Sequence, residues 1–221
     1  MDMLEAIAQR HSVRQYLTKP LSEDAVTALQ QEIAACNREA GLHIQLVTEE
    51  PKAFQSTLAK YGQFKGVSNY LALVGPKGPE LEEKSGYYGQ RLVLAAQMLG
   101  LNTCWVALTY KKVPEAFVVG PGEKLVIVIA LGYGENQGAA RRSKAPQQVS
   151  NVTDASPDWF KKGVDAALLA PTAVNQQKFY LTRNGDTVTA KAGFGFNTKI
   201  DLGIVKYNFE AAAGKDNFIW A

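Results

Sequence analysis

The sequence predicts an α+β fold, and four segments of the chain indicate it. Residues 22–38 repeat apolar side chains at helical spacing, and residues 86–99 are apolar over much of a predicted helix surface. Residues 124–131 form a continuous aliphatic run, which is typical of a strand buried on both faces. Residues 178–191 contain Asn184-Gly185, the strongest short signal for a hairpin turn.

The length and composition are those of a folded globular protein. The chain has 221 residues, about 1.5 typical domains, so either one large domain or two small ones would account for it. Hydrophobic residues make up 46% and charged residues 20%, which excludes a disordered or collagen-like chain. The net charge of +3 is too small to indicate a dedicated nucleic-acid binder.

Cysteine content and hydropathy further narrow the class of protein to which the chain can belong. Cys36 and Cys104 are too few for a disulfide scaffold, and a Cys/His zinc site is not expected beside only His11 and His43. We interpret both cysteines and His43 as structural residues. The acidic N-terminus lacks the features of a secretory leader, and the longest apolar runs are far shorter than the ~20 residues that span a bilayer. We therefore expect a cytoplasmic protein without a membrane partner.

The remaining elements of the first part of the chain follow from local patterns. Ser22 is a good N-cap for the helix at 22–38, and Gly100 is a natural residue to follow the helix at 86–99. Four further elements are expected: a helix at 2–9, a strand at 43–48, a helix at 52–60 and a buried strand at 69–74. An extended segment is expected at 103–108.

The last third of the chain has its own start and stop signals. Ser156 as N-cap and Pro157 at the first helical position predict the start of a helix that points Phe160, Val164 and Leu168 inward. After the hairpin, a last helix is expected at 201–213, where Gly214 ends it.

A weak internal repeat relates the two parts of the chain. Residues 22–26 resemble residues 156–160, and each begins a helix that leads through a loop to a strand. Residues 89–100 resemble residues 203–214, and both are predicted helices that end in glycine. The pattern predicts two related halves, of which the second is shorter. The alternative is a chance similarity between amphipathic helices.

The segment from Arg10 to Arg14 combines two guanidinium groups, an imidazole and a hydroxyl. Arginine offers a planar fork of donors that suits phosphate, and Ser12 adds a neutral donor. The pattern indicates an anion site. Because the segment follows a predicted helix, the alternative is that its basic side chains only complement the helix dipole.

A second basic cluster lies at 141–146, after the buried strand and a glycine-rich loop at 132–138. Loops after buried strands are favoured places for ligands, and two basic clusters would suit one phosphate. A solvated basic loop is the alternative. The glycines do not fit a dinucleotide-binding motif, because Gly138 is one residue too far along and no convincing helix follows it.

Residues 170–179 connect a helix to a strand through small and amide-bearing residues. Small residues let the backbone approach a flat ligand closely, and Asn and Gln supply donors and acceptors for the polar edge of a heterocycle. The alternative is an ordinary connection in which Pro171 stops the helix.

Together these segments resemble the FMN-dependent nitroreductase family. Arg10-His11-Ser12-Val13-Arg14-Gln15-Tyr16 is similar to the family's Arg-x-Ser-x-Arg/Lys-x-aromatic motif, which also follows an N-terminal helix. Residues 170–177, Ala-Pro-Thr-Ala-Val-Asn-Gln-Gln, are similar to its Ala-Pro-Ser-x-x-Asn-x-Gln loop. Three further segments resemble the family's central helix with its flavin-lining segment, its last core strand and its phosphate-binding tail: residues 86–105, 128–133 and 142–146.

The resemblance implies a mixed, mainly antiparallel sheet flanked by helices, in one nitroreductase-like domain over residues 1–221. In the family, the Ala-Pro-Ser loop follows the first long helix, but residues 35–40 of this chain have lost the pattern. The intact loop follows the matching helix of the second half instead. We therefore interpret the chain as a fused pseudo-dimer with one FMN site. Residues 1–150 would form the fuller half with phosphate-binding residues, and residues 151–221 a shortened half that donates the flavin-covering loop.

The resemblance also implies which residues bind FMN. Arg10, Ser12, Arg142 and Lys144 would bind the phosphate, with His11 nearby. Other residues would contact the flavin ring, each at a different part of it. Arg14 would face the N1/O2 edge, where reduced flavin carries negative charge, and Lys65 would assist it. Backbone groups near N5 would come from Ala107 and Leu108, and the residues closing over the ribityl chain and ring would be Pro171, Thr172, Asn175 and Gln177.

The implied activity is that of an FMN-dependent oxidoreductase with ping-pong kinetics. It would take hydride from NAD(P)H and pass electrons to a small acceptor such as a nitroaromatic or a quinone. Because FMN carries the chemistry, no side chain is expected to be catalytic and no metal is expected. Tyr110 or Phe194 would either stack on an acceptor or belong to the core. A monomer is expected, with a homodimer left open.

Two other functions remain alternatives to the reductase. The family often has glycine at the place of Ala107 and Leu108, so a flavin-binding protein for storage or sensing is one alternative. A basic module for anionic ligands or nucleic acid is the other. It would be colourless, and its nucleic-acid binding would fall steeply with salt.

Overall fold

The computed structural model describes the whole chain, residues 1–221, and has the predicted α+β architecture. Contacts divide the chain into two compact units. The sheet unit comprises residues 10–81 and 92–140, and the hairpin unit comprises residues 1–9, 82–91 and 141–221. The division into related halves at residue 150 stays a prediction.

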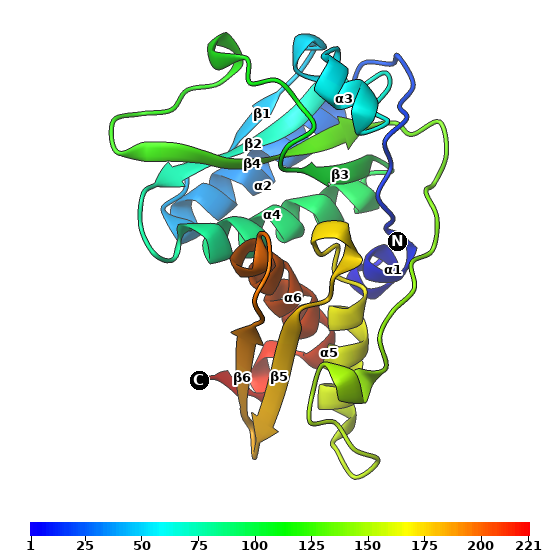
Figure 1. Cartoon of the computed structure of the whole chain (residues 1–221), viewed down its shortest axis with the longest axis vertical. Coiled ribbons are helices and arrows are strands. Elements are labelled where there is room, and N and C mark those ends of the chain that lie inside the picture. The colour runs from blue at the N-terminus through cyan, green and yellow to red at the C-terminus, as the bar shows by residue number, and fades with distance from the viewer. The chain divides into compact units, whose positions relative to one another are not determined.

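A four-stranded sheet forms the centre of the sheet unit (Figure 1). Its strands are β1 (Gln45–Val47), β2 (Asn69–Pro76), β3 (Asn102–Val106) and β4 (Glu123–Gly132), in the order β1-β2-β4-β3. All three pairings are antiparallel, which confirms the mainly antiparallel sheet. The long central pair runs from Asn69 opposite Leu131 to Pro76 opposite Glu123.

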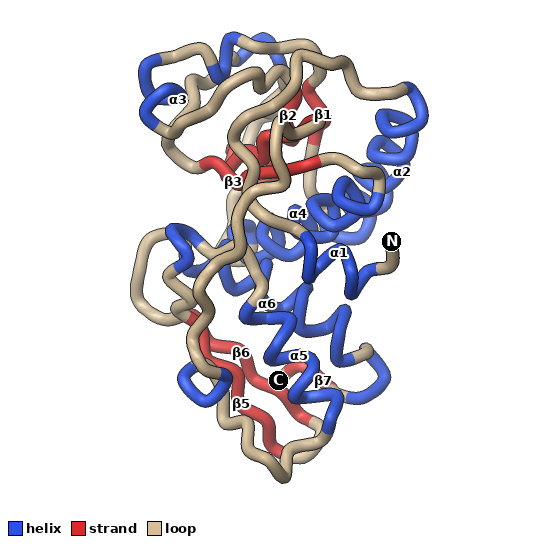
Figure 2. Tube along the Cα trace, turned by 90° about the vertical axis from the view of Figure 1, so that its right-hand side faces the viewer, coloured by secondary structure: helices blue, strands red, loops and turns tan.

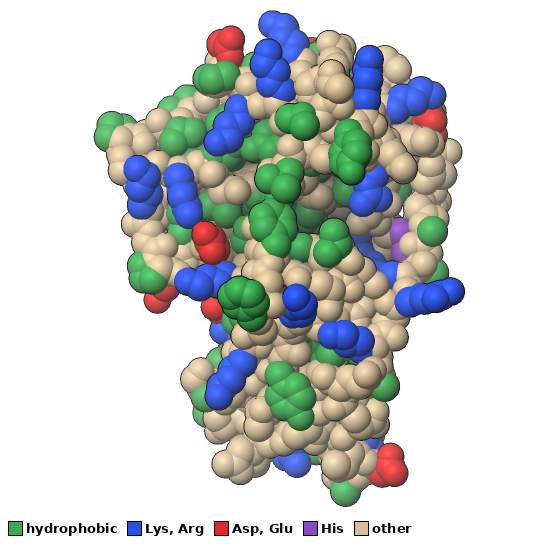
Figure 3. Space-filling model, viewed as in Figure 1, with side chains coloured by type: hydrophobic (Ala, Val, Ile, Leu, Met, Phe, Trp, Pro, Cys, Tyr) green, Lys and Arg blue, Asp and Glu red, His purple; other side chains and the backbone are tan.

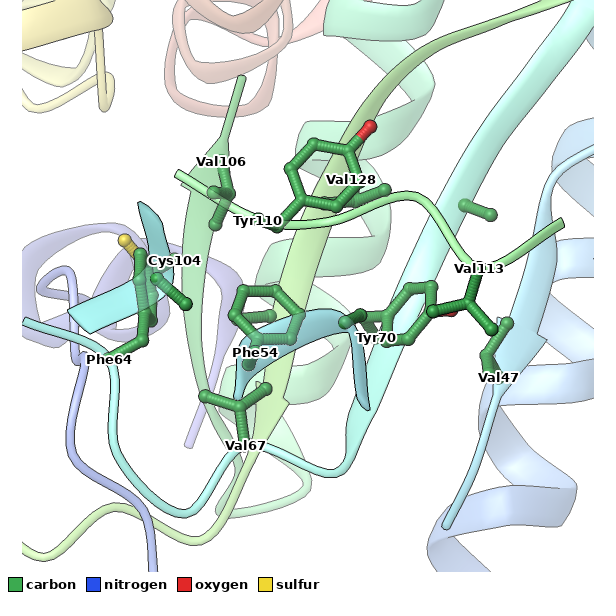
Figure 4. Close-up of a cluster of buried hydrophobic side chains, with 14 of the residues drawn as sticks. Val47, Phe54, Phe64, Val67, Tyr70, Cys104, Val106, Tyr110, Val113 and Val128 are labelled. Atoms are coloured by element: carbon green, nitrogen blue, oxygen red, sulfur yellow. The ribbon is translucent and has the colours of Figure 1, made fainter. Parts of the chain in front are cut away.

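The central strands bury side chains on both faces of this sheet. On one face, Tyr70 of β2 and Val128 of β4 pack with Phe54 and other apolar side chains from the covering loops (Figure 4). On the other face, Leu131 of β4 packs with Leu29 of a helix. Burial on two faces explains why residues 124–131 are apolar at successive positions rather than at alternate ones.

The long helices of the sheet unit begin and end near the predicted residues. In α2 (Glu23–Ala40), the Ser22 hydroxyl accepts a hydrogen bond from the Ala25 N–H at 3.3 Å, and Gly41 follows in the left-handed conformation. Helix α4 (Leu81–Met98) begins before the predicted residue 86, and its residues 82–91 belong to the hairpin unit.

The single helix predicted at 52–60 is wrong. The segment forms a 3₁₀ turn, η1 (Lys52–Phe54), and a separate short helix, α3 (Thr57–Tyr61). The division has a local cause, because the Ser56 hydroxyl accepts a hydrogen bond from the Ala59 N–H at 3.2 Å and so starts a new helix.

The hairpin unit packs helices against a second sheet (Figure 2). Its helices are α1 (Met3–Gln9), α5 (Asp158–Leu168) and α6 (Thr198–Ala213), with part of α4. Its strands are β5 (Phe179–Asn184), β6 (Thr187–Ala192) and β7 (Ile219–Trp220), in the order β5-β6-β7. Strands β5 and β6 are antiparallel and β6 and β7 parallel, so the sheet is mixed.

Two details of the hairpin unit differ from the sequence prediction by one residue. Asn184 pairs with Thr187, so the turn consists of Gly185 and Asp186 rather than Asn184-Gly185. Helix α5 has Pro157 at its N-cap, and Ser156 does not cap it. The Ser156 hydroxyl instead accepts a hydrogen bond from the Thr153 N–H at 3.0 Å, which occupies the predicted capping group.

The interior of the hairpin unit is aromatic. Phe160, one of the three predicted inward residues of α5, packs edge-on against Phe209 of α6, and Phe209 contacts Phe218 in the same way. Val164 and Leu168 are also buried, as predicted.

Helix α6 packs closely on residues 82–91 through glycine. A Cβ atom at Gly203 would lie 2.0 Å from the Glu83 carbonyl oxygen, and one at Gly86 would lie 2.0 Å from that of Ile200. Only glycine permits these backbones to approach so closely.

The other 3₁₀ turns are η2 (Pro114–Ala116), η3 (Pro146–Gln148), η4 (Ala173–Asn175) and η5 (Lys215–Asn217). None of the helices combines the length and the apolar character that crossing a membrane would require.

Candidate functional site

The predicted site residues divide between the two units. The sheet unit contains Arg10, His11, Ser12, Arg14, Lys65, Ala107 and Leu108. The hairpin unit contains Arg142, Lys144, Pro171, Thr172, Asn175 and Gln177.

In the sheet unit, the predicted phosphate motif is held by main-chain hydrogen bonds. The Val13 N–H donates to the Thr103 carbonyl of β3 at 3.1 Å. The Tyr16 N–H donates to the Lys65 carbonyl at 2.9 Å, and the Lys65 N–H donates to the Arg14 carbonyl at 3.0 Å. The segment is therefore fixed by its backbone, which leaves the direction of its side chains to other contacts.

The glycine-rich loop at 132–138 lies against this segment. The Glu135 N–H donates to the Gln15 carbonyl at 2.9 Å. A Cβ atom at Gly138 would lie 2.6 Å from the His11 Cβ, and Gly138 has a φ of +73°. Close packing and a left-handed turn account for this glycine, which agrees with rejecting a dinucleotide-binding motif.

The side chains of the motif lie in different environments. Arg10 is only 1% exposed, whereas Arg14 is exposed. The Ser12 hydroxyl hydrogen-bonds the buried thiol of Cys104. Burial raises the pKa of that thiol, while the Arg14 guanidinium and the Ser12 hydroxyl act in the opposite direction. Cys104 is a free, buried cysteine, as its structural interpretation expects.

Burial also raises the pKa of the Tyr16 phenol well above its usual range, and the Cys104 charge adds to this rise. The phenol donates to the Val13 carbonyl at 2.7 Å. Arg14 lowers the same pKa, so its positive charge acts on both buried groups.

The remaining sheet-unit residues lie near the surface. The Lys65 ammonium forms an ion pair with Glu135 of the glycine-rich loop at 3.0 Å. Ala107 and Leu108 follow the end of β3, and Leu108 is 68% exposed. Tyr110 belongs to the buried cluster on the first face of the sheet, so it is a core residue (Figure 4).

In the hairpin unit, the predicted flavin-covering loop has an unusual backbone. Val174, Asn175 and Gln177 have φ angles of 45°, 54° and 46°. Residues other than glycine seldom adopt this left-handed region, and a β-branched residue such as valine does so at particular cost. Such strain persists only where surrounding contacts fix the conformation.

Side chains supply those contacts, and they join the loop to the basic tail. The Asn175 amide donates to the Arg142 carbonyl at 2.7 Å. The Gln177 side-chain oxygen accepts from the Lys144 N–H at 2.8 Å, and the Lys144 ammonium donates to the Gln177 carbonyl at 2.8 Å. The structure therefore places two predicted segments, the basic tail and the 170–177 loop, in direct contact.

Two further contacts hold the middle of the loop through an acid that sequence reasoning missed. Asp201 of α6 accepts hydrogen bonds from the Ala173 N–H at 2.9 Å and from the Gln176 amide at 2.7 Å. Asp201 is 3% exposed, and burial raises its pKa to about 6 although both hydrogen bonds lower it. An acid near the start of a helix is common, so the sequence carries no distinctive signal for this role.

Exposed apolar side chains lie beside these contacts. Val174 is 95% exposed and Phe194 100% exposed, so Phe194 is not a core residue. The carbonyl of Phe196, which is also exposed, accepts from the Gln176 amide at 2.8 Å.

Basic side chains are spread over the face shown in Figure 3 among hydrophobic and neutral ones, rather than gathered into one patch. No group of three or more His, Cys, Asp or Glu side chains is placed to hold a metal ion.

A family model described as "Putative TM nitroreductase" matches residues 2–213. The chain belongs to this nitroreductase family. The match extends over both units and over every predicted site residue. No curated protein matches the chain.

Solved structures share the nitroreductase fold with this chain. A "putative nitroreductase" from Thermotoga maritima has a TM-score of 0.68 at 21% identity, covering 98% of this chain and 85% of that one. One from Desulfovibrio desulfuricans, solved in complex with FMN, has a TM-score of 0.54 at 17% identity, covering 71% of this chain and 99% of that one. A "putative NADH dehydrogenase/NAD(P)H nitroreductase" from Parabacteroides distasonis has a TM-score of 0.53 at 22% identity, covering 66% of this chain and 95% of that one. At these identities the likeness shows the fold.

Proposed function

We propose that the chain is an FMN-dependent oxidoreductase that takes hydride from NAD(P)H and reduces a small acceptor such as a nitroaromatic or a quinone. Family membership and the FMN complex of the Desulfovibrio desulfuricans protein support the flavin. The likeness to the Parabacteroides distasonis NADH dehydrogenase/NAD(P)H nitroreductase supports the nicotinamide donor. The observation that carries the proposal is the strained loop at 172–177, fastened by its own amides to the basic tail.

The donors of the predicted phosphate set suit the anionic end of FMN. Arg142 and Lys144 are exposed cations on the tail that the loop fastens. A guanidinium offers a fork of donors, and an ammonium has three, of which Lys144 uses one on Gln177. Ser12 adds a neutral donor with His11 nearby, and the buried Arg10 adds positive charge.

The remaining residues suit the ring and ribityl chain. Arg14 is an exposed cation, and we assign it to the N1/O2 edge with Lys65 assisting. Ala107 and Leu108 would provide backbone groups near N5. Further contacts to the ring and ribityl chain would come from Pro171, Thr172, Asn175 and Gln177.

Bound FMN would supply the hydride and electron chemistry, so no side chain need act as a nucleophile or general base. The protein's own tasks are to bind the phosphate, to orient the ring and to place positive charge beside it. Donor and acceptor would use the site in turn, which gives ping-pong kinetics. We propose one FMN per chain.

The visible spectrum of the pure protein tests this function directly. A yellow protein, or a colourless one that turns yellow on FMN addition, is expected to hold one FMN per chain and to bleach anaerobically with NADH or NADPH. A protein that stays colourless after FMN addition would overturn the proposal, and two FMN per chain would contradict the single site.

A flavin-binding protein for storage or sensing is the second candidate. Leu108 favours it, because a large side chain stands where the family often has glycine. A yellow protein that neither NADH nor NADPH bleaches would support this candidate over the reductase.

A further inference from the structure

Asp201 accepts hydrogen bonds on both carboxylate oxygens, and both donors belong to the flavin-covering loop. Oδ1 accepts from the Ala173 main-chain N–H at 2.9 Å. Oδ2 accepts from the Gln176 side-chain amide at 2.7 Å. The acid lies four residues from the N-cap of α6, Asn197, whose carbonyl accepts the Asp201 N–H at 2.9 Å. The carboxylate is therefore attached to a regular helix and reaches a strained loop.

The same amide joins a second loop to the first. Gln176 Nε2 also donates to the Phe196 carbonyl at 2.8 Å. A Cβ atom at Gly195 would lie 2.7 Å from Gln176 Oε1, so the two loops are in close contact. Asp201, through Gln176, holds residues 172–177 and residues 194–197 together.

Charge pairing does not explain an acid at this place. No charged side chain forms an ion pair with Asp201, and its pKa responds only to burial and to the two hydrogen bonds. Burying an unpaired carboxylate is costly. An ionised carboxylate is, however, a side chain that only accepts hydrogen bonds, and both partners here only donate. An Asn would place an N–H₂ group against one of them.

The loop needs such a restraint. Val174 has a φ of 45° and is 95% exposed, so its own side chain gains little from burial that could offset the strain. Its neighbours Ala173 and Gln176 carry the two bonds to Asp201. The restraint acts on both sides of the strained residue.

We propose that Asp201 is a positioning residue for the cofactor site, which holds the 172–177 loop and the 194–197 loop in one fixed arrangement for FMN binding. This inference rests on the proposed function, in which Thr172, Asn175 and Gln177 contact FMN. It adds a residue that contacts none of the reacting groups and acts through the loop.

Asp201→Asn is the primary test, because it keeps size and one acceptor but opposes the Gln176 donor. In the protein without FMN, we expect faster hydrogen exchange in peptides covering residues 172–177. FMN affinity is expected to fall by about tenfold, the effect of losing one hydrogen bond to a charged group. At saturating FMN, the visible circular dichroism of the bound flavin should also change, which a general loss of stability would not cause.

Two further variants make the result decisive. Gln176→Met removes the same hydrogen bond from the other side, so it should give the same three changes, and the double variant should be no worse than the more affected single one. Gln176→Met also provides the test on its own if the Asp201→Asn variant does not fold. Asp158→Asn, at an exposed acid on α5, is the matched control and should leave all three measurements unchanged.

Unchanged exchange, affinity and dichroism in both Asp201→Asn and Gln176→Met would overturn the positioning role. Additive effects in the double variant would also count against it. If the unaltered protein does not bind FMN, the proposed function fails, while the exchange result still decides whether Asp201 restrains the loop.

Discussion

The two predicted ligand segments are held in opposite ways. The Arg10–Tyr16 segment is fixed by main-chain hydrogen bonds to β3, to Lys65 and to the glycine-rich loop, and none of its residues has a positive φ. The 172–177 loop has three non-glycine residues with positive φ and is fixed largely by side chains.

The first segment therefore keeps its conformation through its backbone, whereas the second depends on its side chains to keep its conformation. In the sheet unit, main-chain hydrogen bonds hold the segment, and glycines such as Gly66 and Gly138 stand where other backbone lies too close for a side chain. In the hairpin unit, Asn175, Gln176 and Gln177 each maintain the loop, so substituting any of them changes its geometry. Four predictions test this contrast.

Gly66→Ala should have the largest effect, because it breaks the main-chain attachment of the first segment. The new Cβ would lie 2.1 Å from the Tyr16 carbonyl oxygen, and Gly66 has a φ of +71°. Neither backbone can move without losing the hydrogen bonds at Lys65, so we expect a loss of about 3 kcal/mol or more in the free energy of unfolding.

Urea denaturation measures this loss, with Gly78→Ala as the control in the same unit. No heavy atom lies within 4 Å of a Cβ at Gly78, and its φ is not positive. Equal stability of the two variants would show that the Lys65–Tyr16 contact does not hold the segment.

Arg142→Ala tests whether a residue of the hairpin unit can lose its side chain without losing the loop. The Asn175 and Gln177 amides bond the Arg142 carbonyl, which the variant keeps. The loop should therefore persist, while FMN binding weakens by about 10- to 100-fold through loss of a charged donor.

Isothermal titration with FMN measures the affinity, and hydrogen exchange at 172–177 reports the loop. Lys191→Ala, at an exposed cation on β6, is the control. Unaltered FMN affinity in Arg142→Ala would remove Arg142 from the phosphate set.

Local patterns predicted most elements, because caps and apolar periodicity act within a few residues. Ser22 and the run at 124–131 are examples. The helix predicted at 52–60 failed because a mid-segment serine can cap a new helix as well as lie within one.

The candidate site was predictable only in parts. The motifs at 10–16 and 170–177 could be found because their residue types are unusual in combination. The attachment of the loop to the tail depends on residues 33 positions apart in sequence, such as Lys144 and Gln177. Asp201 was missed because its role depends on which loop packs against α6, which no local pattern reveals.

Asp201 should make the stability of the protein depend on pH in a direction opposite to that of a salt-bridged acid. Its pKa is raised from 3.8 to about 6 in the folded protein. The folded state therefore binds a proton more readily than the unfolded chain does. This contribution to stability is complete below pH 3.8 and is lost as the pH rises through 6.

Relative to Asp201→Asn, which does not titrate, the unaltered protein should gain about 2 kcal/mol in its free energy of unfolding as the pH falls from about 8 to about 4.5. Urea midpoints of both proteins across this range measure the difference. A difference that is constant with pH would show that Asp201 has an ordinary pKa and is not buried against the loop.

Val174→Gly should have the smallest effect, and its sign is the informative part. Glycine adopts a φ of 45° without the steric cost that valine meets, and the Val174 side chain is 95% exposed, so little burial is lost. Glycine also gives the unfolded chain more conformational entropy, which lowers stability. Because the relief of strain should exceed this loss, we expect the free energy of unfolding to rise by about 0.5 kcal/mol. Val119→Gly is the control, because Val119 is exposed and has no positive φ, so glycine there should destabilise the protein.

If Val174→Gly also destabilises the protein, the loop is not strained at this residue. A rise in stability together with weaker FMN binding would mean that the strained valine is kept for the shape it gives the loop, since the bonds to Asp201 remain in the variant.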